Sequence, residues 1–211
     1  MNEHLSRAFF ARPTLDVARD LLGKRLTRRL SGERLSGYIV EVEAYVGEDD
    51  QSSHARPGLT ARNAPMYGPP GFTYVYLIYG MYHCLNFVTE RAGYPAAVLV
   101  RALEPLEGLA TQQRLRGPQH PPRDLARGPG RLCQALAIDL TLNARDVCAD
   151  DAPLWIEDAP PIAESRVARS PRIGVRGDDR AVSIPWRFYL RESPWVSGKV
   201  SFNRHHAKTG Q

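Results

Sequence analysis

The chain has 211 residues, of which 43% are hydrophobic and 24% charged, and its formal net charge is +5. This length supports one hydrophobic core, so we expect a single domain of ordinary globular composition. No run of 18 apolar residues and no secretory leader occur, which excludes a transmembrane helix, and three widely spaced cysteines favour an intracellular protein.

Arginine supplies most of the positive charge, since only three of the 28 basic residues are lysines, namely Lys24, Lys199 and Lys208. A GC-rich coding sequence would produce the same ratio. Its chemical consequence is that phosphate contacts would come from guanidinium groups, whose planar fork suits them. The net charge permits nucleic-acid binding without requiring it.

The N-terminal part of the chain predicts an arm, a helix and a hairpin. Residues 1–12 are expected to form the arm, and Thr14 is predicted to cap a helix over Leu15–Leu22. Alternating strands are predicted at Lys24–Leu30 and Leu35–Val46, which a short turn joins into a hairpin.

Four tyrosines dominate the stretch Tyr74-Val-Tyr-Leu-Ile-Tyr-Gly-Met-Tyr82. Period-2 alternation places Tyr74, Tyr76 and Ile78 on one face of a strand, and Gly80 permits a tight turn that leaves Tyr79 at an exposed tip. In a basic protein, such a tip fits a wedge that enters a duplex and holds open the gap left by an extruded nucleobase. The alternative is a half-buried sheet surface whose hydroxyl groups face water.

The later elements complete the fold prediction. A buried strand is expected at Ala96–Leu103, followed by a helix from Pro105 to Leu115 and a loop at Arg116–Arg127. The order of elements predicts one α+β domain over residues 1–197, with a largely antiparallel β-sheet, peripheral helices and a protruding β-hairpin, and a flexible tail over 198–211. Further elements are predicted at Phe72–Tyr79, Met81–Val88, Arg131–Ala137, Pro153–Ile156, Arg172–Val175 and Ile184–Leu190.

Two acidic residues and a tyrosine share one face of the strand that ends at Val46, namely Glu41, Glu43 and Tyr45. Two carboxylates buried close together raise the pKa of at least one of them, and such a group can act as a general base on water. An aromatic ring beside the acid favours a pocket in which a nucleobase stacks. The alternative is two solvent-facing glutamates on an edge strand.

Arg101 interrupts the apolar run at Ala96–Leu103. A buried arginine needs an anionic partner, which Glu43 or a phosphate would provide. The alternative is an arginine that reaches solvent at the strand end near Glu104. His54 lies in a long irregular segment without metal-ligand spacing, and no nucleotide-binding, serine-hydrolase or zincin motif occurs, so we expect neither metal nor cofactor.

Together these segments resemble the alkyladenine (3-methyladenine) DNA glycosylase family, which consists of monofunctional base-excision enzymes with an antiparallel α+β fold. The resemblance covers residues 8–197 in the family's order and spacing. The matching runs are Val42-Glu-Ala-Tyr45-Val-Gly47, Ser53-His54-Ala-Arg56, Tyr74-Val-Tyr-Leu-Ile-Tyr-Gly-Met-Tyr82, Leu99-Val-Arg-Ala-Leu-Glu-Pro-Leu-Glu-Gly108, Gly128-Pro-Gly-Arg-Leu-Cys-Gln-Ala-Leu-Ala-Ile138, Arg172-Ile-Gly-Val175 and Arg187-Phe-Tyr-Leu-Arg-Glu-Ser-Pro-Trp-Val-Ser197.

The resemblance implies a DNA repair enzyme that flips alkylated or deaminated purines, such as 3-methyladenine, 7-methylguanine, hypoxanthine and ethenoadenine, out of duplex DNA. It would hydrolyse the N-glycosidic bond without lyase activity, cofactor or metal. Glu43 would activate the attacking water, which Arg101 and the backbone carbonyl of Ile173 would help to hold. The expected partner is double-stranded DNA containing damaged purines, and the enzyme is expected to be a cytoplasmic monomer without membrane contact. Because the long N-terminal extension of mammalian members is absent, the enzyme is expected to be bacterial.

The same resemblance implies the residues that would contact the substrate. Tyr45 would stack on one face of the flipped nucleobase, with His54 and Tyr76 on the other. Asn86 would sit beside the purine C2 edge and repel the amino group of guanine. At the hairpin tip Tyr79 would be the minor-groove wedge, and the DNA-binding residues there are Tyr79, Met81 and Tyr82.

Three other functions compete with this interpretation. A bifunctional glycosylase needs an amine nucleophile, but none of the three lysines falls in a matching run. A non-catalytic nucleic-acid-binding module would use the tyrosines as a stacking platform and would not need Glu43 or Arg101. A domain like those at the C-terminus of formyltransferases shares this α+β shape, which indicates nothing about activity.

Overall fold

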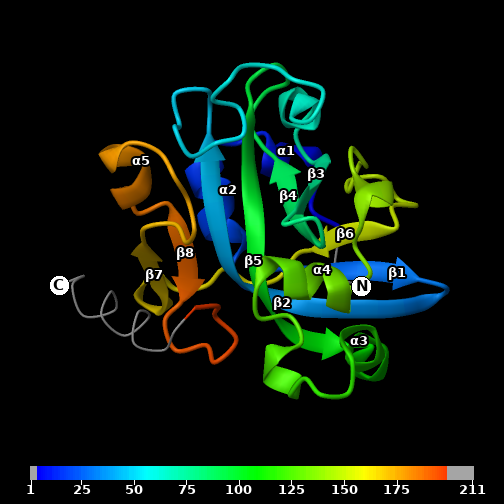
Figure 1. The fold of residues 1–211 in the computed structure, drawn as a ribbon. Helices are drawn as coiled ribbons and strands as arrows, with labels where there is room; N and C mark the ends of the chain where they lie inside the picture. Colours follow the sequence, from blue (N-terminus) through cyan, green and yellow to red (C-terminus); the bar gives the residue numbers. More distant parts are fainter. Residues whose placement is uncertain (1–3, 199–211) are drawn as a thin grey trace.

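An eight-stranded antiparallel sheet organises the chain (Figure 1), as seen in a computed structural model that describes residues 4–198. The strand order is β3-β4-β5-β2-β1-β6, and β8 pairs with β2 and with β7. The predicted α+β class with a largely antiparallel sheet is confirmed. The strands are β1 (Arg25–Leu30), β2 (Glu33–Val46), β3 (Thr73–Ile78), β4 (Tyr82–Val88), β5 (Ala96–Glu107), β6 (Leu154–Glu157), β7 (Val167–Ser170) and β8 (Arg187–Leu190).

Strands β2 and β5 run side by side through the middle of the molecule (Figure 1). Their register contains three irregularities, one at Ser36–Gly37 and two near the site, where Ile39 opposes Leu103, Glu41 opposes Ala102 and Val42 opposes Val100. Val40 on β2 is therefore the extra residue of one β-bulge, and Arg101 on β5 is the extra residue of the next. A bulge redirects a side chain and bends the strand, so this pairing brings Arg101 to the side chains of both Glu41 and Glu43.

The helices are short and pack around the sheet. In Figure 1, α2 lies behind β2 and β5 and buries Val17, Ala18 and Leu21 against them, while α4 packs on β4 and β5 through Leu132 and Cys133. None of the helices described is long and apolar enough to cross a membrane. The helices are α1 (Arg7–Phe10), α2 (Thr14–Leu21), α3 (Leu109–Arg116), α4 (Pro129–Ala135) and α5 (Asp179–Ser183), with 3₁₀ turns at Ala64–Tyr67, Pro122–Asp124, Leu140–Leu142 and Glu164–Arg166.

Residues 4–12 pack against the domain and do not extend from it as the expected arm, and residues 1–3 of that prediction lie outside the described residues. Phe10 ends helix α1, has 0% of its surface exposed, and packs its ring 5.9 Å from that of Phe87. Thr14 is the first residue of α2 and not its cap, since Pro13 holds the capping position. The Thr14 hydroxyl instead donates to Glu90.

Three further local predictions are wrong. Pro105 does not begin a helix, because β5 continues to Glu107 and α3 starts only after Gly108, whose φ is +67°. The stretch Arg172–Val175 forms no strand, and only Arg187–Leu190 of the predicted strand at Ile184–Leu190 is extended in the sheet. Of the predicted tail at 198–211, residues 199–211 lie outside the residues that the structure describes.

Replacing Phe10 by alanine tests whether the N-terminal helix belongs to the core. Phe10→Ala should reduce the free energy of unfolding by about 3–5 kcal/mol, because it removes a fully buried aromatic ring and leaves a cavity. Urea denaturation followed by circular dichroism measures this change. Leu59→Ala, at an exposed loop position, is the control and should change it by less than about 0.5 kcal/mol. Equal stability of both variants would show that residues 4–12 are a separable arm.

Candidate active site

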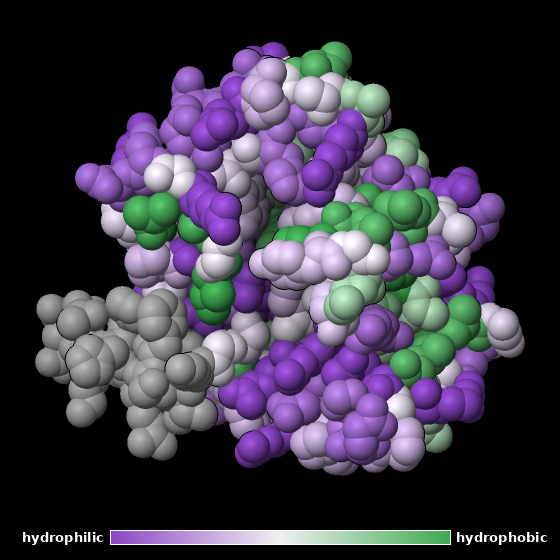
Figure 2. Space-filling view, viewed as in Figure 1, coloured by the Kyte–Doolittle hydropathy of each residue, from purple (hydrophilic) through white to green (hydrophobic). Residues whose placement is uncertain are grey.

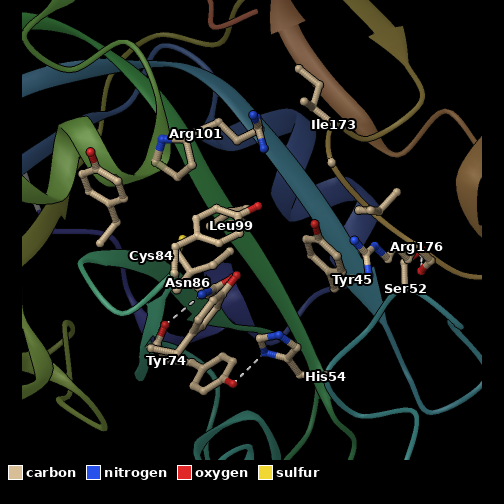
Figure 3. Close-up of a pocket in the computed structure, with 18 of the residues that line it drawn as sticks. Tyr45, Ser52, His54, Tyr74, Cys84, Asn86, Leu99, Arg101, Ile173 and Arg176 are labelled. Atoms are coloured by element: carbon tan, nitrogen blue, oxygen red, sulfur yellow. Dashed lines mark hydrogen bonds between the residues drawn. The ribbon is translucent and has the colours of Figure 1, made fainter.

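A pocket of about 480 Å³ opens between β2, β5 and the β3–β4 hairpin (Figure 3). Side chains reach it from the strands, from the loop after β2 and from the segment after β7, and the space-filling view shows a hollow in the middle of this face (Figure 2). Eight of the ten predicted site residues line this pocket: Tyr45, His54, Tyr76, Tyr79, Tyr82, Asn86, Arg101 and Ile173.

Glu43 lies directly behind the pocket wall, with 0% of its surface exposed. Its Oε1 accepts a hydrogen bond from the backbone amide of Ile173 at 2.7 Å and pairs with Arg101 Nη1 at 3.2 Å. Its Oε2 accepts the hydroxyl proton of Tyr45 at 2.9 Å. All three donors line the pocket. The structure thus shows Ile173 acting on Glu43 through its amide, whereas the expected role of its carbonyl stays a prediction.

Arg101 is buried between Glu41 and Glu43 of β2. Its Nε donates to Glu41 at 3.0 Å and its Nη1 pairs with Glu43. Burial opposes the charge of this guanidinium, but the carboxylates of Glu43 and Glu41 raise the pKa of Arg101 above its ordinary range. The expectation of a carboxylate partner is confirmed, and the alternative in which Arg101 reaches solvent near Glu104 is wrong.

Glu41 accepts hydrogen bonds from donors in the C-terminal part of the domain, which sequence reasoning missed. It accepts from Arg187 Nε at 2.7 Å and from the Ser197 amide and hydroxyl at 2.6 and 2.9 Å. Burial acts to raise the pKa of Glu41, but Arg101 and Arg187 hold it below its ordinary value, so this carboxylate is ionised. Arg187 begins the apolar strand β8, and this is the same anomaly that singled out Arg101.

His54 and two tyrosines of strand β3 form one wall of the pocket. The His54 Nδ1 lies 2.8 Å from the Tyr74 hydroxyl, and its ring meets the Tyr76 ring edge-on at 4.5 Å. Burial and the charge of Arg62 lower the pKa of His54, while burial raises the pKa of Tyr74 to about 12. The imidazole is therefore neutral near pH 7 and shares one hydrogen bond with the Tyr74 hydroxyl.

Asn86 is buried in the same pocket on strand β4. Its side-chain amide donates to the carbonyl of Tyr74, the residue directly opposite it on β3, at 2.9 Å. This bond fixes the orientation of the amide in the pocket (Figure 3). The side chain is therefore held by a hydrogen bond within the hairpin.

The hairpin tip presents apolar and aromatic side chains to solvent. Tyr79 is 81% exposed and has a φ of +53°, and Gly80 follows at +68°, so the turn has two residues with positive φ. Met81 and Tyr82 are also exposed. A bulky residue with positive φ is strained, and such strain is typical of functional sites. The prediction that Tyr79 stands at an exposed tip is confirmed, whereas Met81 does not line the pocket.

A basic groove of about 570 Å³ adjoins the pocket on the side of α4. The two share Tyr82, Pro129 and Gly130, so the groove continues the pocket along the surface. Arg116 and Arg131 both line the groove, and burial together with the charge of Arg131 lowers the pKa of Arg116. Two guanidinium groups at one groove favour an anionic ligand.

An acid buried behind a tyrosine-lined pocket, beside an exposed aromatic tip and a basic groove, fits the class of enzymes that act on a nucleobase extruded from a duplex. A model of the methylpurine-DNA glycosylase family matches residues 8–194, and the chain belongs to this family. It is a DNA glycosylase, a hydrolase that acts on the N-glycosidic bond, and a DNA repair protein.

Similar proteins come from archaea, bacteria and mammals. A protein from Methanocella arvoryzae assigned as a 3-methyladenine DNA glycosylase is 52% identical over 196 residues, which cover 93% of this chain and 96% of that protein. The mouse DNA-3-methyladenine glycosylase is 47% identical over 205 residues, which cover 92% of this chain and 61% of the mouse protein. The resemblance inferred from the sequence is confirmed.

The charge state of His54 is testable by NMR. We expect its imidazole to titrate below the ordinary pKa of 6.5, and Arg62→Gln to raise this pKa toward 6.5, because the variant removes the second cause of the shift and leaves burial unchanged. Imidazole proton shifts recorded against pH measure both values. Arg56→Gln, in the same loop, is the control and should leave the titration unchanged. A titration of His54 above 6.5 would contradict the neutral assignment.

Proposed function

We propose that the protein excises alkylated and deaminated purines from double-stranded DNA by base flipping, and that Glu43 activates the hydrolytic water. The observation that carries this proposal is the buried Glu43 carboxylate, whose two hydrogen-bond donors and ion-pair partner all line the tyrosine pocket. The proposed substrates are 3-methyladenine, 7-methylguanine, hypoxanthine and ethenoadenine. The names of the relatives from Methanocella arvoryzae and mouse support 3-methyladenine among these.

The hydrogen bonds of Glu43 suggest how it would act as a general base. A carboxylate offers about four acceptor positions when ionised, and hydrogen bonds from the protein take one on Oε1, where Arg101 also pairs, and one on Oε2. The attacking water would donate to the remaining position on Oε2. As its oxygen forms the bond to C1′ of the sugar, its proton passes to Glu43, and the electron pair of the broken C1′–N bond leaves with the purine. A cationic alkylated purine departs neutral, which makes it a good leaving group.

The pocket supports recognition of a flipped purine by stacking. Tyr45 would contact one face of the nucleobase, and His54 with Tyr76 the other, while Asn86 would exclude guanine at the C2 edge. Tyr79 would enter the duplex from the tip and compensate for the stacking that extrusion removes, which is worth about 1–3 kcal/mol per nucleobase. Because stacking accepts any purine, selectivity would come from the edge contacts and from the leaving group.

The described residues favour hydrolysis without lyase activity. A lyase needs an amine that can attack C1′. The ammonium group of Lys24 pairs with Asp158 and donates to the carbonyl of Ala159, and it does not line the pocket. Lys199 and Lys208 lie outside the residues that the structure describes.

Removal of the general base tests the proposed mechanism. Glu43→Gln should slow single-turnover release of hypoxanthine from a duplex oligonucleotide by about 10²–10⁴-fold or more, because the amide keeps the shape but cannot take the proton. Affinity for the same duplex should stay within a few-fold. Free base, abasic site and strand cleavage are scored separately, and Glu48→Gln, at an exposed acid, is the control. A Glu43→Gln enzyme with most of the wild-type rate would refute the assignment.

We also propose that the basic groove binds backbone phosphates of the strand that leaves the pocket. Arg116→Gln with Arg131→Gln should reduce the slope of log Kd against log salt concentration by about one for each phosphate that the variant no longer neutralises. Fluorescence anisotropy with labelled duplexes between low and moderate salt measures the slope. Arg169→Gln, on β7 outside both the pocket and the groove, is the matched control. Equal slopes for the groove variant and the wild type would show that this groove does not contact DNA.

A further inference from the structure

A buried ion pair that is separate from the Arg101 cluster joins Arg172 and Asp50 behind the pocket. Arg172 Nη1 lies 2.6 Å from Asp50 Oδ2 and Nη2 lies 2.8 Å from Oδ1, and at most 1% of either side chain is exposed. Arg172 also donates to the carbonyls of Ala44 and Ala181, each at 3.0 Å. Two parallel hydrogen bonds fix the plane of a guanidinium as well as its position, so this group is held rigidly.

The held guanidinium supports the tyrosine that would stack on the substrate. Its central carbon lies 4.6 Å from the centroid of the Tyr45 ring and 5.3 Å from that of Trp186, within the range of cation–π attraction. The Tyr45 hydroxyl donates to Oε2 of Glu43. Arg172 thereby acts, through Tyr45, on one oxygen of the carboxylate.

The backbone beside Arg172 acts on the other oxygen. Ile173 follows Arg172 directly, and its amide donates to Oε1 of Glu43 at 2.7 Å. Because Arg172 is bonded to the carbonyl of Ala44, the residue next to Glu43 on β2, the Ile173 amide is fixed relative to the acid. This part of the chain forms no strand, so the ion pair, and not strand pairing, fixes its position relative to β2.

Asp50 extends the same support to the loop that carries His54. Its carboxylate accepts hydrogen bonds from the amides of Val46 and Ser52 at 3.3 and 3.1 Å. These bonds close the first turn of the long segment after β2. The pair therefore touches three parts of the site, namely the end of β2, the segment that begins at Arg172 and the start of the His54 loop.

We propose that Arg172 and Asp50 are positioning residues, whose buried pair holds Tyr45, the Ile173 amide and the His54 loop so that Glu43 faces the sugar in one orientation. The inference rests on the proposed role of Glu43 as the general base. Neither residue touches the substrate in this scheme. Stability alone does not require the pair, because replacing a buried ion pair by uncharged groups of similar volume is often neutral or stabilising.

The double variant Asp50→Asn/Arg172→Met separates positioning from folding. It removes both charges together, so neither is left buried without a partner. We expect a folded protein whose single-turnover rate of hypoxanthine release falls by roughly 10–100-fold, because small misplacements of a catalytic group cost rate on this scale. Affinity for the lesion duplex should fall much less than the rate. A folded double variant with the wild-type rate would show that the pair is only structural.

Lys24→Met/Asp158→Asn is the matched control, since it removes an ion pair that lies outside the pocket. It should keep the wild-type rate. If the main double variant does not fold, Arg172→Lys is measured instead. It keeps the charge but lacks the planar fork, and we expect a smaller loss of rate at unchanged affinity. A wild-type rate for this variant overturns the proposal.

Hydrogen exchange of the Ile173 amide gives a readout that does not depend on activity. The amide should exchange slowly in the wild type and in the control, and at least about tenfold faster in the Asp50→Asn/Arg172→Met variant, since its bond to Glu43 would open more often. Unchanged exchange together with a reduced rate would contradict the proposed route through Ile173. Failure of the proposed function gives a different result, because then the wild type itself releases no damaged purine.

Discussion

The guanidinium of Arg101 forms ion pairs with both Glu41 and Glu43, and at most 9% of any of these three side chains is exposed. Two carboxylates this close would repel each other in a medium of low dielectric constant, and either one buried without a partner would destabilise the fold strongly. The cluster can form only when β2 and β5 pair with the bulge at Arg101, and Arg187 completes it when β8 joins β2. The geometry of the site therefore depends on the same strand pairing that builds the hydrophobic core.

Two glutamates of the same strand acquire different roles because their surroundings differ. Glu41 accepts four hydrogen bonds, from Arg101, Arg187 and both donors of Ser197, and none of these residues except Arg101 lines the pocket. Glu43 accepts two hydrogen bonds and forms one ion pair, and all three partners line the pocket. Environment commonly assigns distinct roles to neighbouring acids in this way. Glu41 fixes the arginine, and the arginine in turn fixes Glu43 beside the pocket.

The sequence predicts the parts of the fold and site that follow from local patterns. Alternation identifies the hairpin, Gly80 identifies its turn, and an arginine inside an apolar run identifies Arg101 as the partner of an acid. Local patterns fail where long-range contacts decide. Pro105 has a preference for the first turn of a helix, but pairing with Gly37 keeps it in β5. No pattern marks Asp50 as the partner of Arg172, because the two are 122 positions apart in the chain.

The β3–β4 hairpin carries both Tyr79, the proposed wedge, and Asn86, the residue proposed to contact the purine C2 edge. Its cross-strand pairs run from Ile78 and Tyr82 next to the tip to Tyr74 and Asn86 in the pocket. The outer edge of β3 is covered, since the amide of Val75 donates to the side chain of Asn143, so the hairpin is supported along its base. A hairpin held at its base keeps its tip and its pocket residues in one fixed relation. Entry of Tyr79 into a duplex would therefore place the pocket at a set position relative to the gap, with Asn86 held there by its bond to the Tyr74 carbonyl. The opening of the base stack by Tyr79 and the contact of Asn86 with the C2 edge of the extruded purine would then be coupled.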